Sequence, residues 1–279
     1  MTAEGDSEAL CADLLSQGFG FLPIGSEIAQ GTKSVFERAT DFFELPLAEK
    51  LTCQLPADSG FHPFGVEYSG SADRPDPIES FTATARLPIA NLPRFPRAAH
   101  SLYSEMLRIL DALEQLAEDV VVVLASTMTG IDQRAALSGS LRRWSSLQVN
   151  HALPITPESP VHPLHEDGHL LTLAFATAPG LEIECGSDAL VPIPPSGDHA
   201  VVMPGEIAAL LSGGLVPPLF HRVVRCSGAA NRMALLYFVD IDPRLCRPWR
   251  AGPANSAIDI GQLVLSNATR FGRKPFDLE

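Results

Sequence analysis

The chain has 279 residues, of which 46% are hydrophobic, so it can fill the core of one large or two small domains. It has 33 acidic against 20 basic residues, a formal net charge of −13, which repels phosphate backbones and anionic membrane surfaces. We therefore expect neither a nucleic-acid nor a membrane partner.

The cysteines and the N-terminus indicate a cytoplasmic protein. The five cysteines form no CxxC pair, which favours neither a disulfide framework nor a thiolate zinc site. The opening MTAEGDSEAL lacks the basic start and apolar core of a signal peptide, and no run approaches the roughly 20 apolar residues of a membrane span. Nothing in the pattern predicts an oligomeric state.

Residues 1–138 form a predicted helical and loop-rich N-terminal part. Pro56 to Pro96 is rich in Pro, Gly and Asp, which is typical of irregular loops with short strands. Apolar residues then recur every three or four positions from Arg97 to Thr129. This spacing predicts a long amphipathic helix that supports the core and stops at Gly130.

Residues 139–245 form a predicted jelly-roll core. Breakers such as PG, GG and PPSG separate short β-like segments, namely SLQVNHAL, LLTLAFA, GLEIEC, HAVVMP, EIAALLS, HRVVRC and RMALLYFVDI. Many short strands at regular spacing favour a sandwich or barrel of the jelly-roll kind. We expect one domain over residues 1–279, mainly β with flanking helices, in which residues 246–279 form a C-terminal segment.

A candidate metal site lies in HPLHEDGHLLTLAF, where His165 and Asp167 precede an apolar strand. Residues two apart on an extended chain point to the same side, so an imidazole and a carboxylate can hold one ion. His221 opens a later segment and adds a second imidazole. Two histidines and one carboxylate form the facial triad that holds non-haem Fe(II) with open positions, whereas structural zinc is closed by four protein ligands.

Three other histidines leave alternatives open. His162 and His169 lie beside the candidate ligands, and His169 is also two residues from Asp167, although it lies inside the apolar strand. His151 can either reach the pocket or pack in the core.

The order of several motifs resembles the isopenicillin N synthase-like branch of the Fe(II)- and 2-oxoglutarate-dependent dioxygenases. The motifs span nearly the whole chain: QGFGFLPI, DFFELPLAEK, GF at 60–61, DPIESF, HEDGHLLTLAF, GLEIE, PGEIAALLSGG, HRVV and RMA. The stretch PGEIAALLSGGLVPPLFHRV is especially similar to bacterial cephalosporin-type ring-expanding and hydroxylating members.

This resemblance implies a double-stranded β-helix, cupin-like, flanked by helices. His165, Asp167 and His221 are the implied iron ligands, and Arg232, which opens the segment after His221, is the implied partner of the distal 2-oxoglutarate carboxylate. The implied reaction uses Fe(II), 2-oxoglutarate and O2 to hydroxylate, desaturate or rearrange a small organic molecule, with natural-product or antibiotic biosynthesis as the setting.

The chain departs from the family pattern at two motifs. Arg-x-Ser is replaced by Arg232-Met233-Ala234, and an NYYP-like stretch by NHALP at 150–154. A 2-oxoglutarate-independent Fe(II) oxidase or cyclase, and a non-catalytic jelly-roll binding protein, therefore remain alternatives.

Gln148 and Asn150 alternate on the strand that should face the pocket, so we expect them to contact cofactor or substrate. Relatives that grip an acidic substrate can carry arginines on this strand. Their absence predicts a substrate that is not anchored there by a carboxylate.

Overall fold

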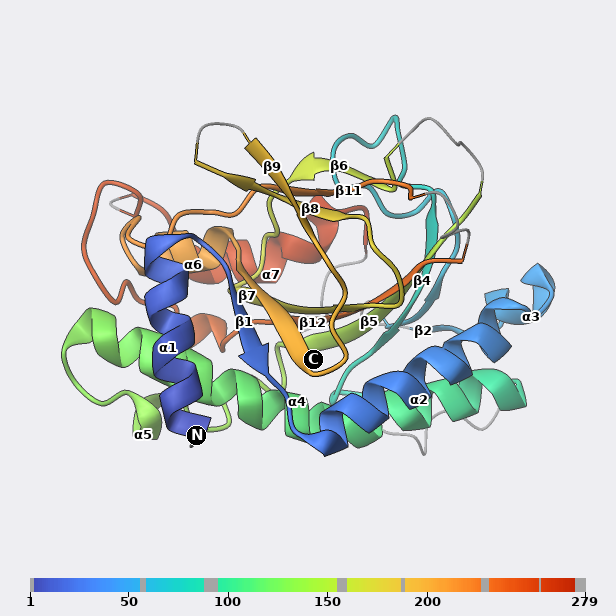
Figure 1. Cartoon of the computed structure of the whole chain (residues 1–279), viewed down its shortest axis with the longest axis horizontal. Coiled ribbons are helices and arrows are strands. Elements are labelled where there is room, and N and C mark those ends of the chain that lie inside the picture. Colours follow the sequence, from blue (N-terminus) through green and yellow to red (C-terminus); the bar gives the residue numbers. More distant parts are fainter. Residues whose placement is uncertain are drawn as a thin grey trace.

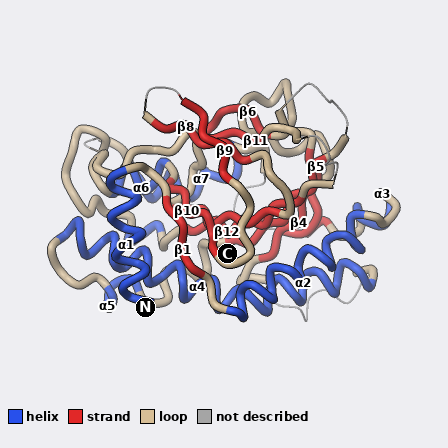
Figure 2. The backbone as a smooth tube through the Cα atoms, in the orientation of Figure 1, coloured by secondary structure: helices blue, strands red, loops and turns tan. Residues whose placement is uncertain are grey.

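Two antiparallel sheets face each other, and helices surround them (Figure 1, Figure 2). The computed structural model describes residues 3–55, 59–87, 95–154, 160–186, 189–226, 231–255 and 257–273. The prediction of a mainly β jelly-roll core with flanking helices is confirmed.

In the part of the chain that the structure describes, the larger sheet has eight strands. Their spatial order is β1 (Gly20–Pro23), β10 (His199–Pro204), β7 (Leu171–Ala176), β12 (Met233–Val239), β5 (Ser146–Ala152), β4 (Ile78–Ala83), β3 (Ser59–His62) and β2 (Gln54–Leu55). Because β2, β3 and β4 extend the sheet of the later strands, residues from the N-terminal part join the jelly-roll sheet. The three-part division of the chain stays a prediction.

The smaller sheet lies opposite the middle of the larger one and has four strands within the described ranges. Their order is β6 (His162–His165), β11 (His221–Val223), β8 (Leu181–Cys185) and β9 (Ala189–Ile193). Among the strands of four or more residues, β1, β6 and β9 were not in the expected segments. Each has only four or five residues, and each contains an internal or terminal proline, which weakens the strand pattern.

Helices cover the outer face of the large sheet. They are α1 (Ala3–Ser16), α2 (Ser26–Phe43) and α4 (Arg97–Thr129), and Figure 1 shows α2 and α4 running side by side beneath the strands. The predicted long helix is confirmed at both ends, and Gly130 stops it in the left-handed conformation with φ 73°. Its apolar stripe packs in one core with Leu147, Val149 and Leu235 of the sheet.

The expectation of a strand at EIAALLS is wrong, because this segment forms α6 (Glu206–Leu211). Ile207, Ala208, Leu210 and Leu211 are all buried, so the run is apolar on every side and has no period to distinguish helix from strand. Alanine and leucine are strong helix formers, and Gly205 precedes the helix in an extended conformation.

The remaining elements complete the surface of the molecule. They are α3 (Leu47–Leu51), α5 (Arg134–Leu137), the short 3₁₀ helix η2 (Pro243–Leu245) and α7 (Ile260–Arg270). Within Pro56 to Pro96, the expected short strands are β3 and β4, whereas residues 56–58 and 88–94 lie outside the described residues. None of the helices in the described part of the chain has the length and apolarity needed to cross a bilayer.

Candidate active site

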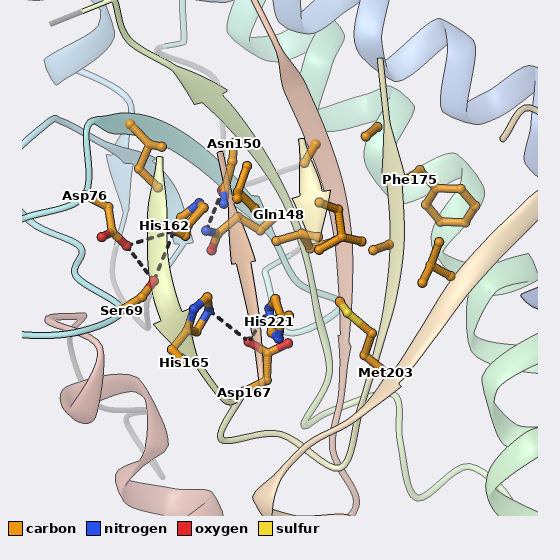
Figure 3. Close-up of a pocket in the computed structure, with 18 of the residues that line it drawn as sticks. Ser69, Asp76, Gln148, Asn150, His162, His165, Asp167, Phe175, Met203 and His221 are labelled. Atoms are coloured by element: carbon orange, nitrogen blue, oxygen red, sulfur yellow. Dashed lines mark hydrogen bonds and ion pairs between the residues drawn. The ribbon is translucent and has the colours of Figure 1, made fainter. Parts of the chain in front are cut away.

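A cavity lies between the inner faces of the two sheets (Figure 3). Alternate residues of each strand line it, as expected for a pleated sheet. On β5, Gln148 and Asn150 face the cavity, while Leu147 and Val149 between them pack in the helix-covered core. The predicted orientation of Gln148 and Asn150 is therefore confirmed.

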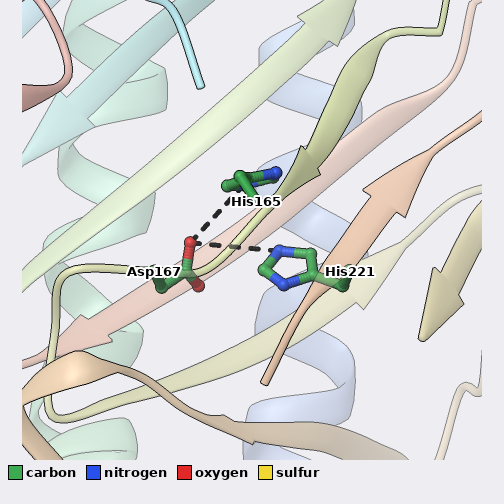
Figure 4. Close-up of side chains that lie close together, drawn as sticks. All are labelled: His165, Asp167 and His221. Carbon is green, nitrogen blue, oxygen red and sulfur yellow. Dashed lines mark ion pairs between the residues drawn. The ribbon is translucent and has the colours of Figure 1, made fainter. Parts of the chain in front are cut away.

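His165, Asp167 and His221 converge at one end of this cavity (Figure 4). His165 ends β6 and pairs in register with His221, which begins β11, while Asp167 lies in the loop that follows β6. Nε2 of His165 is 3.7 Å and Nε2 of His221 is 3.9 Å from Asp167 Oδ1. The three atoms lie within 4.8 Å of one another, so they can coordinate a single cation.

Hydrogen bonds orient all three side chains for this task. His165 Nδ1 lies 2.7 Å from the Pro163 carbonyl oxygen, and His221 Nδ1 lies 3.4 Å from the Leu219 carbonyl oxygen. Because a carbonyl only accepts, each Nδ1 carries the proton and each Nε2 presents its lone pair. The Thr172 hydroxyl donates to Asp167 Oδ2 at 2.5 Å, which leaves Oδ1 toward the histidines.

The electrostatics keep His165 and Asp167 in the protonation states that a cation requires. Burial, together with the neighbouring His221, lowers the pKa of His165 to about 4, so its imidazole is neutral at pH 7. Burial alone would raise the pKa of Asp167. His221, His165 and the Thr172 hydroxyl outweigh that effect, so the pKa of Asp167 lies below its usual range and the group is a carboxylate.

The loop that carries Asp167 is held from two sides. The backbone N–H of Glu206, at the start of α6, donates to the Asp167 carbonyl at 2.9 Å, and a Cβ on Gly205 would lie 2.4 Å from that oxygen. On the other side, a Cβ on Gly168 would lie 2.1 Å from Oδ1 of Asn267 in α7. Glycine is therefore needed at position 205, where the close atoms belong to the backbone, while a side chain at position 168 would displace Asn267.

The three histidines that the sequence leaves as alternatives have protein partners. His169 is buried, its Nδ1 lies 2.6 Å from Asp240 Oδ2, and its ring stacks on Phe238. His151 Nδ1 lies 3.2 Å from Glu79, which pairs with buried Lys50 outside the cavity. His162 lines the cavity, where its Nδ1 lies 2.8 Å from Asp76. None of the three belongs to the ligand cluster.

Arg232 lies just before β12, on the larger sheet, whereas β11 with His221 belongs to the smaller one. Its side chain is 7% exposed and lines the cavity. Nε donates to the carbonyl oxygens of Ala178 and Pro179 at 3.3 and 3.2 Å. Burial lowers the pKa of Arg232 to about 10, so the guanidinium stays charged at pH 7.

No aspartate or glutamate pairs with Arg232 within the described ranges. A buried cation without a counter-ion is costly, and a ligand carboxylate removes that cost. A Cβ on Gly180, whose φ is 136°, would lie 2.5 Å from the Val224 carbonyl oxygen and 3.4 Å from Arg232 Nε. Glycine at this position therefore allows the backbone to pass close to the Arg232 side chain.

Gln148 lies at the centre of a hydrogen-bonded network. Its Oε1 accepts from Arg273 and Thr82 at 2.9 and 3.0 Å, and its Nε2 donates to Glu67 and Asn150 at 3.0 and 2.7 Å. Since a guanidinium only donates and a carboxylate only accepts, the amide can have only this orientation. All four hydrogen-bonding positions of Gln148 are thus filled by the protein.

The network also sets the orientation of Asn150. Its Oδ1 accepts from Gln148, so Nδ2 is left as a donor, and no acceptor for it lies in the part of the chain that the structure describes. Sequence reasoning missed Glu67 and Arg273, which also line the cavity. Arg273 lies 125 residues from Gln148 and Glu67 lies 81 residues away, and no motif connects them.

Residues 144–241 match the model of a protein family described as the 2OG-Fe(II) oxygenase superfamily. They form a 2OG-Fe(II) oxygenase domain. The match includes all three residues of the cluster and Arg232. No curated protein matches the sequence significantly.

Solved structures share the fold over most of the chain, well beyond the residues that match the family model. A putative 2OG-Fe(II) oxygenase family protein from Caulobacter crescentus has a TM-score of 0.75 at 19% identity, covering 96% of this chain and 94% of its own. A full-length Neurospora crassa protein, in complex with alpha-KG, has a TM-score of 0.73 at 20% identity, covering 94% and 89%. JOX2, in complex with 2OG, Fe and JA, has a TM-score of 0.69 at 18% identity, covering 87% and 74%.

The cavity fits the groups that a 2OG-Fe(II) oxygenase uses. Two imidazoles and one carboxylate suit Fe(II), and the uncompensated guanidinium suits a dicarboxylate. The protein is therefore an Fe(II)- and 2-oxoglutarate-dependent dioxygenase, with O2 as co-substrate.

Proposed function

We propose that His165, Asp167 and His221 bind the iron and that the enzyme oxidises a small organic molecule by hydroxylation, desaturation or ring rearrangement. One observation carries the ligand assignment. Both Nδ1 atoms face backbone carbonyls, so both Nε2 lone pairs are directed at the same point as Asp167 Oδ1. Packing alone does not require two lone pairs and a carboxylate to converge.

Arg232 is the proposed partner of the distal 2-oxoglutarate carboxylate. Its Nε is occupied by backbone carbonyls, which fixes the guanidinium and leaves its outer nitrogens for a bidentate pair. Ala234 offers no hydroxyl for a further contact. Losing that hydrogen bond costs about 1 kcal/mol, which weakens cofactor binding without preventing it.

Asn150, oriented by Gln148, is the proposed second cofactor contact. Its Nδ2 is a donor inside the cavity, and 2-oxoglutarate carries only acceptor oxygens at neutral pH. Gln148 has no vacant hydrogen-bonding position, so it acts on the cofactor through Asn150.

Iron, 2-oxoglutarate and O2 together supply the oxidising power for attack on a substrate C–H bond. The protein's own residues orient and enclose that chemistry. The apolar side chains of Leu181, Val223 and Leu236 line the cavity and reduce its access to water. The Thr172 hydroxyl keeps Asp167 from rotating away.

Membership of the isopenicillin N synthase-like branch, a role in natural-product biosynthesis and a cytoplasmic location are part of this proposal. The order of motifs from QGFGFLPI to RMA supports the branch. PGEIAALLSGG, the motif most similar to the cephalosporin-type enzymes, includes Gly205 and α6, which support the Asp167 loop.

An anaerobic titration tests the proposal. Fe(II) and then 2-oxoglutarate are added to the apo-protein, and the visible charge-transfer band of the iron chelate is recorded. We expect the band in the wild type and its loss in Arg232→Ala. Arg222→Ala is the matched control, because Arg222 pairs with Glu182 and does not line the cavity.

The outcomes separate the alternatives. Iron binding without a band in the wild type would favour the 2-oxoglutarate-independent oxidase or cyclase, and absence of iron binding would favour the non-catalytic binding protein. With the band established, succinate release can be used to screen small molecules as substrates.

A further inference from the structure

His162 lines the cavity beside the proposed iron ligands but is not one of them (Figure 3). It begins β6, three residues before His165, and the two imidazole rings have centroids 5.8 Å apart. The iron assignment and the cofactor pocket therefore leave this side chain unexplained.

Asp76 and Ser69 fix the orientation of the His162 ring. Asp76 is 3% exposed, and its Oδ2 lies 2.8 Å from His162 Nδ1. The Ser69 hydroxyl donates to the same Oδ2 at 2.6 Å and lies 3.0 Å from Nδ1. Figure 3 shows the three side chains as a closed triangle at the edge of the cavity.

This triangle determines which ring nitrogen carries the proton. An ionised carboxylate only accepts hydrogen bonds, so Nδ1 must donate to Asp76. In the neutral ring, Nε2 then carries the lone pair. No partner for Nε2 lies within the described residues, and the side chain borders the cavity.

An acceptor at this position does not suit the cofactor. 2-Oxoglutarate has two carboxylates and a keto oxygen, so at neutral pH it has no donor to offer to Nε2. A donor on a second molecule can satisfy Nε2, and a position beside the iron is where the substrate has to lie.

The charges around His162 narrow the substrate class. Glu67 and Asp76 come from the same loop and both line the cavity, and neither pairs with a lysine or arginine in the described part of the chain. Asp76 contacts the His162 ring directly and disfavours an anionic group at Nε2, whereas the two arginines of the cavity contact other residues, Arg232 the Ala178 and Pro179 carbonyls and Arg273 the Gln148 amide. The group that reaches Nε2 is therefore a neutral or cationic donor.

Resting on the proposed function, we infer that His162 is a substrate-recognition residue. Its Nε2 accepts a hydrogen bond from an O–H or N–H group that lies next to the oxidised carbon of the substrate. Asp76 and Ser69 are positioning residues that hold the accepting tautomer.

Pairs of fragments that differ in one donor test this inference. The probes are 2-pyrrolidinone against N-methyl-2-pyrrolidinone, and benzyl alcohol against benzyl methyl ether. Their binding is measured by ligand-observed NMR on full-length protein loaded with Zn(II) and 2-oxoglutarate, which cannot turn over. We expect the wild type to prefer the donor member roughly five- to tenfold, the effect of one hydrogen bond.

Two variants and a control locate the preference. The ratio of the affinities for the donor and the non-donor member should fall to within about twofold in His162→Phe, which keeps a ring but has no acceptor. It should also fall in Asp76→Asn, because an amide can donate to Nδ1 and move the ring proton to Nε2. His199→Phe, at a half-exposed position away from the cavity, should keep the wild-type preference.

The inference is overturned if the wild type binds both members of each pair equally or binds neither, or if the preference persists in His162→Phe and Asp76→Asn. The result is separate from the proposed function. A His162-dependent preference without an Fe(II)–2-oxoglutarate band would reject only the proposed function, and a band without the preference would reject only the recognition role.

Discussion

The two faces of the large sheet are built from the same strands but have different roles. On the helix-covered face, Leu147, Val149 and Leu235 are fully buried in an apolar core. On the cavity face, the neighbouring Gln148 and Asn150 belong to a polar network. The twofold period of a strand therefore separates stability from chemistry at adjacent positions. A single-residue shift in register would exchange them.

The largest effect is expected at the iron site. His221→Ala should abolish retention of Fe(II), because two ligands remain of the three that the proposal assigns. Bound iron after desalting measures this. The variant should still unfold cooperatively in urea. His199→Ala is the matched control and should keep its iron, and retention of iron by His221→Ala would contradict the ligand assignment.

Leu235 and Leu236 give the most direct test of the two faces. Leu235→Ala leaves a hole in the helix-covered core and should lower the free energy of unfolding by about 2 to 5 kcal/mol. Its affinity for 2-oxoglutarate should be unchanged. Leu236→Ala enlarges the cavity, so it should cost less stability and alter cofactor affinity. Urea unfolding measures the free energy of unfolding, and the charge-transfer titration measures the affinity for 2-oxoglutarate. Equal losses of stability and equal changes of affinity in the two variants would contradict the division of roles between the two faces.

Thr172 lies on the cavity face of β7 and touches the proposed iron ligand Asp167. Thr172→Val keeps the shape and removes the hydroxyl, so iron affinity should fall by about 10- to 100-fold. A competition titration with a chelator measures this affinity. Thr177→Val, where the hydroxyl bonds Met233 away from the iron, should be close to wild type.

The smallest effect concerns pH. Burial, together with the neighbouring His221, lowers the pKa of His165 from its ordinary value of 6.5 to about 4 in the folded protein. Between these values the unfolded chain binds more protons, so the free energy of unfolding should fall as the pH is lowered from 6.5 toward 4. Urea unfolding of metal-free protein checks this. In His165→Gln, the free energy of unfolding should depend less on pH in this window. An unchanged dependence would contradict the lowered pKa of His165.

The sequence predicts those features that depend on near neighbours along the chain. The long helix follows from its apolar spacing, and the HxD pair follows from two ligands on one extended segment. The identity of α6 was not predictable, because an apolar run buried on all sides has no period. The short strands β1, β6 and β9 were missed because each contains a proline, which weakens the strand pattern.

Contacts between distant residues account for the rest. Asp76 reaches His162 across 86 residues, and Arg273 reaches Gln148 across 125 residues. Both depend on how a loop and a C-terminal segment pack against the sheet. Motif order indicated His221 and Arg232, whereas the motifs did not assign a role to Glu67, Asp76 or Arg273.

Asn267 has a consequence for how the protein matures in the cell. It contacts Gly168 and His169, 98 residues earlier in the chain, and helps to hold the loop that carries Asp167. During translation, His165, Asp167 and His221 leave the ribosome well before α7 does. The loop would then lack this support, so we expect tight iron loading to follow the synthesis of α7. A nascent chain stalled before residue 260 should bind Fe(II) more weakly than the complete chain.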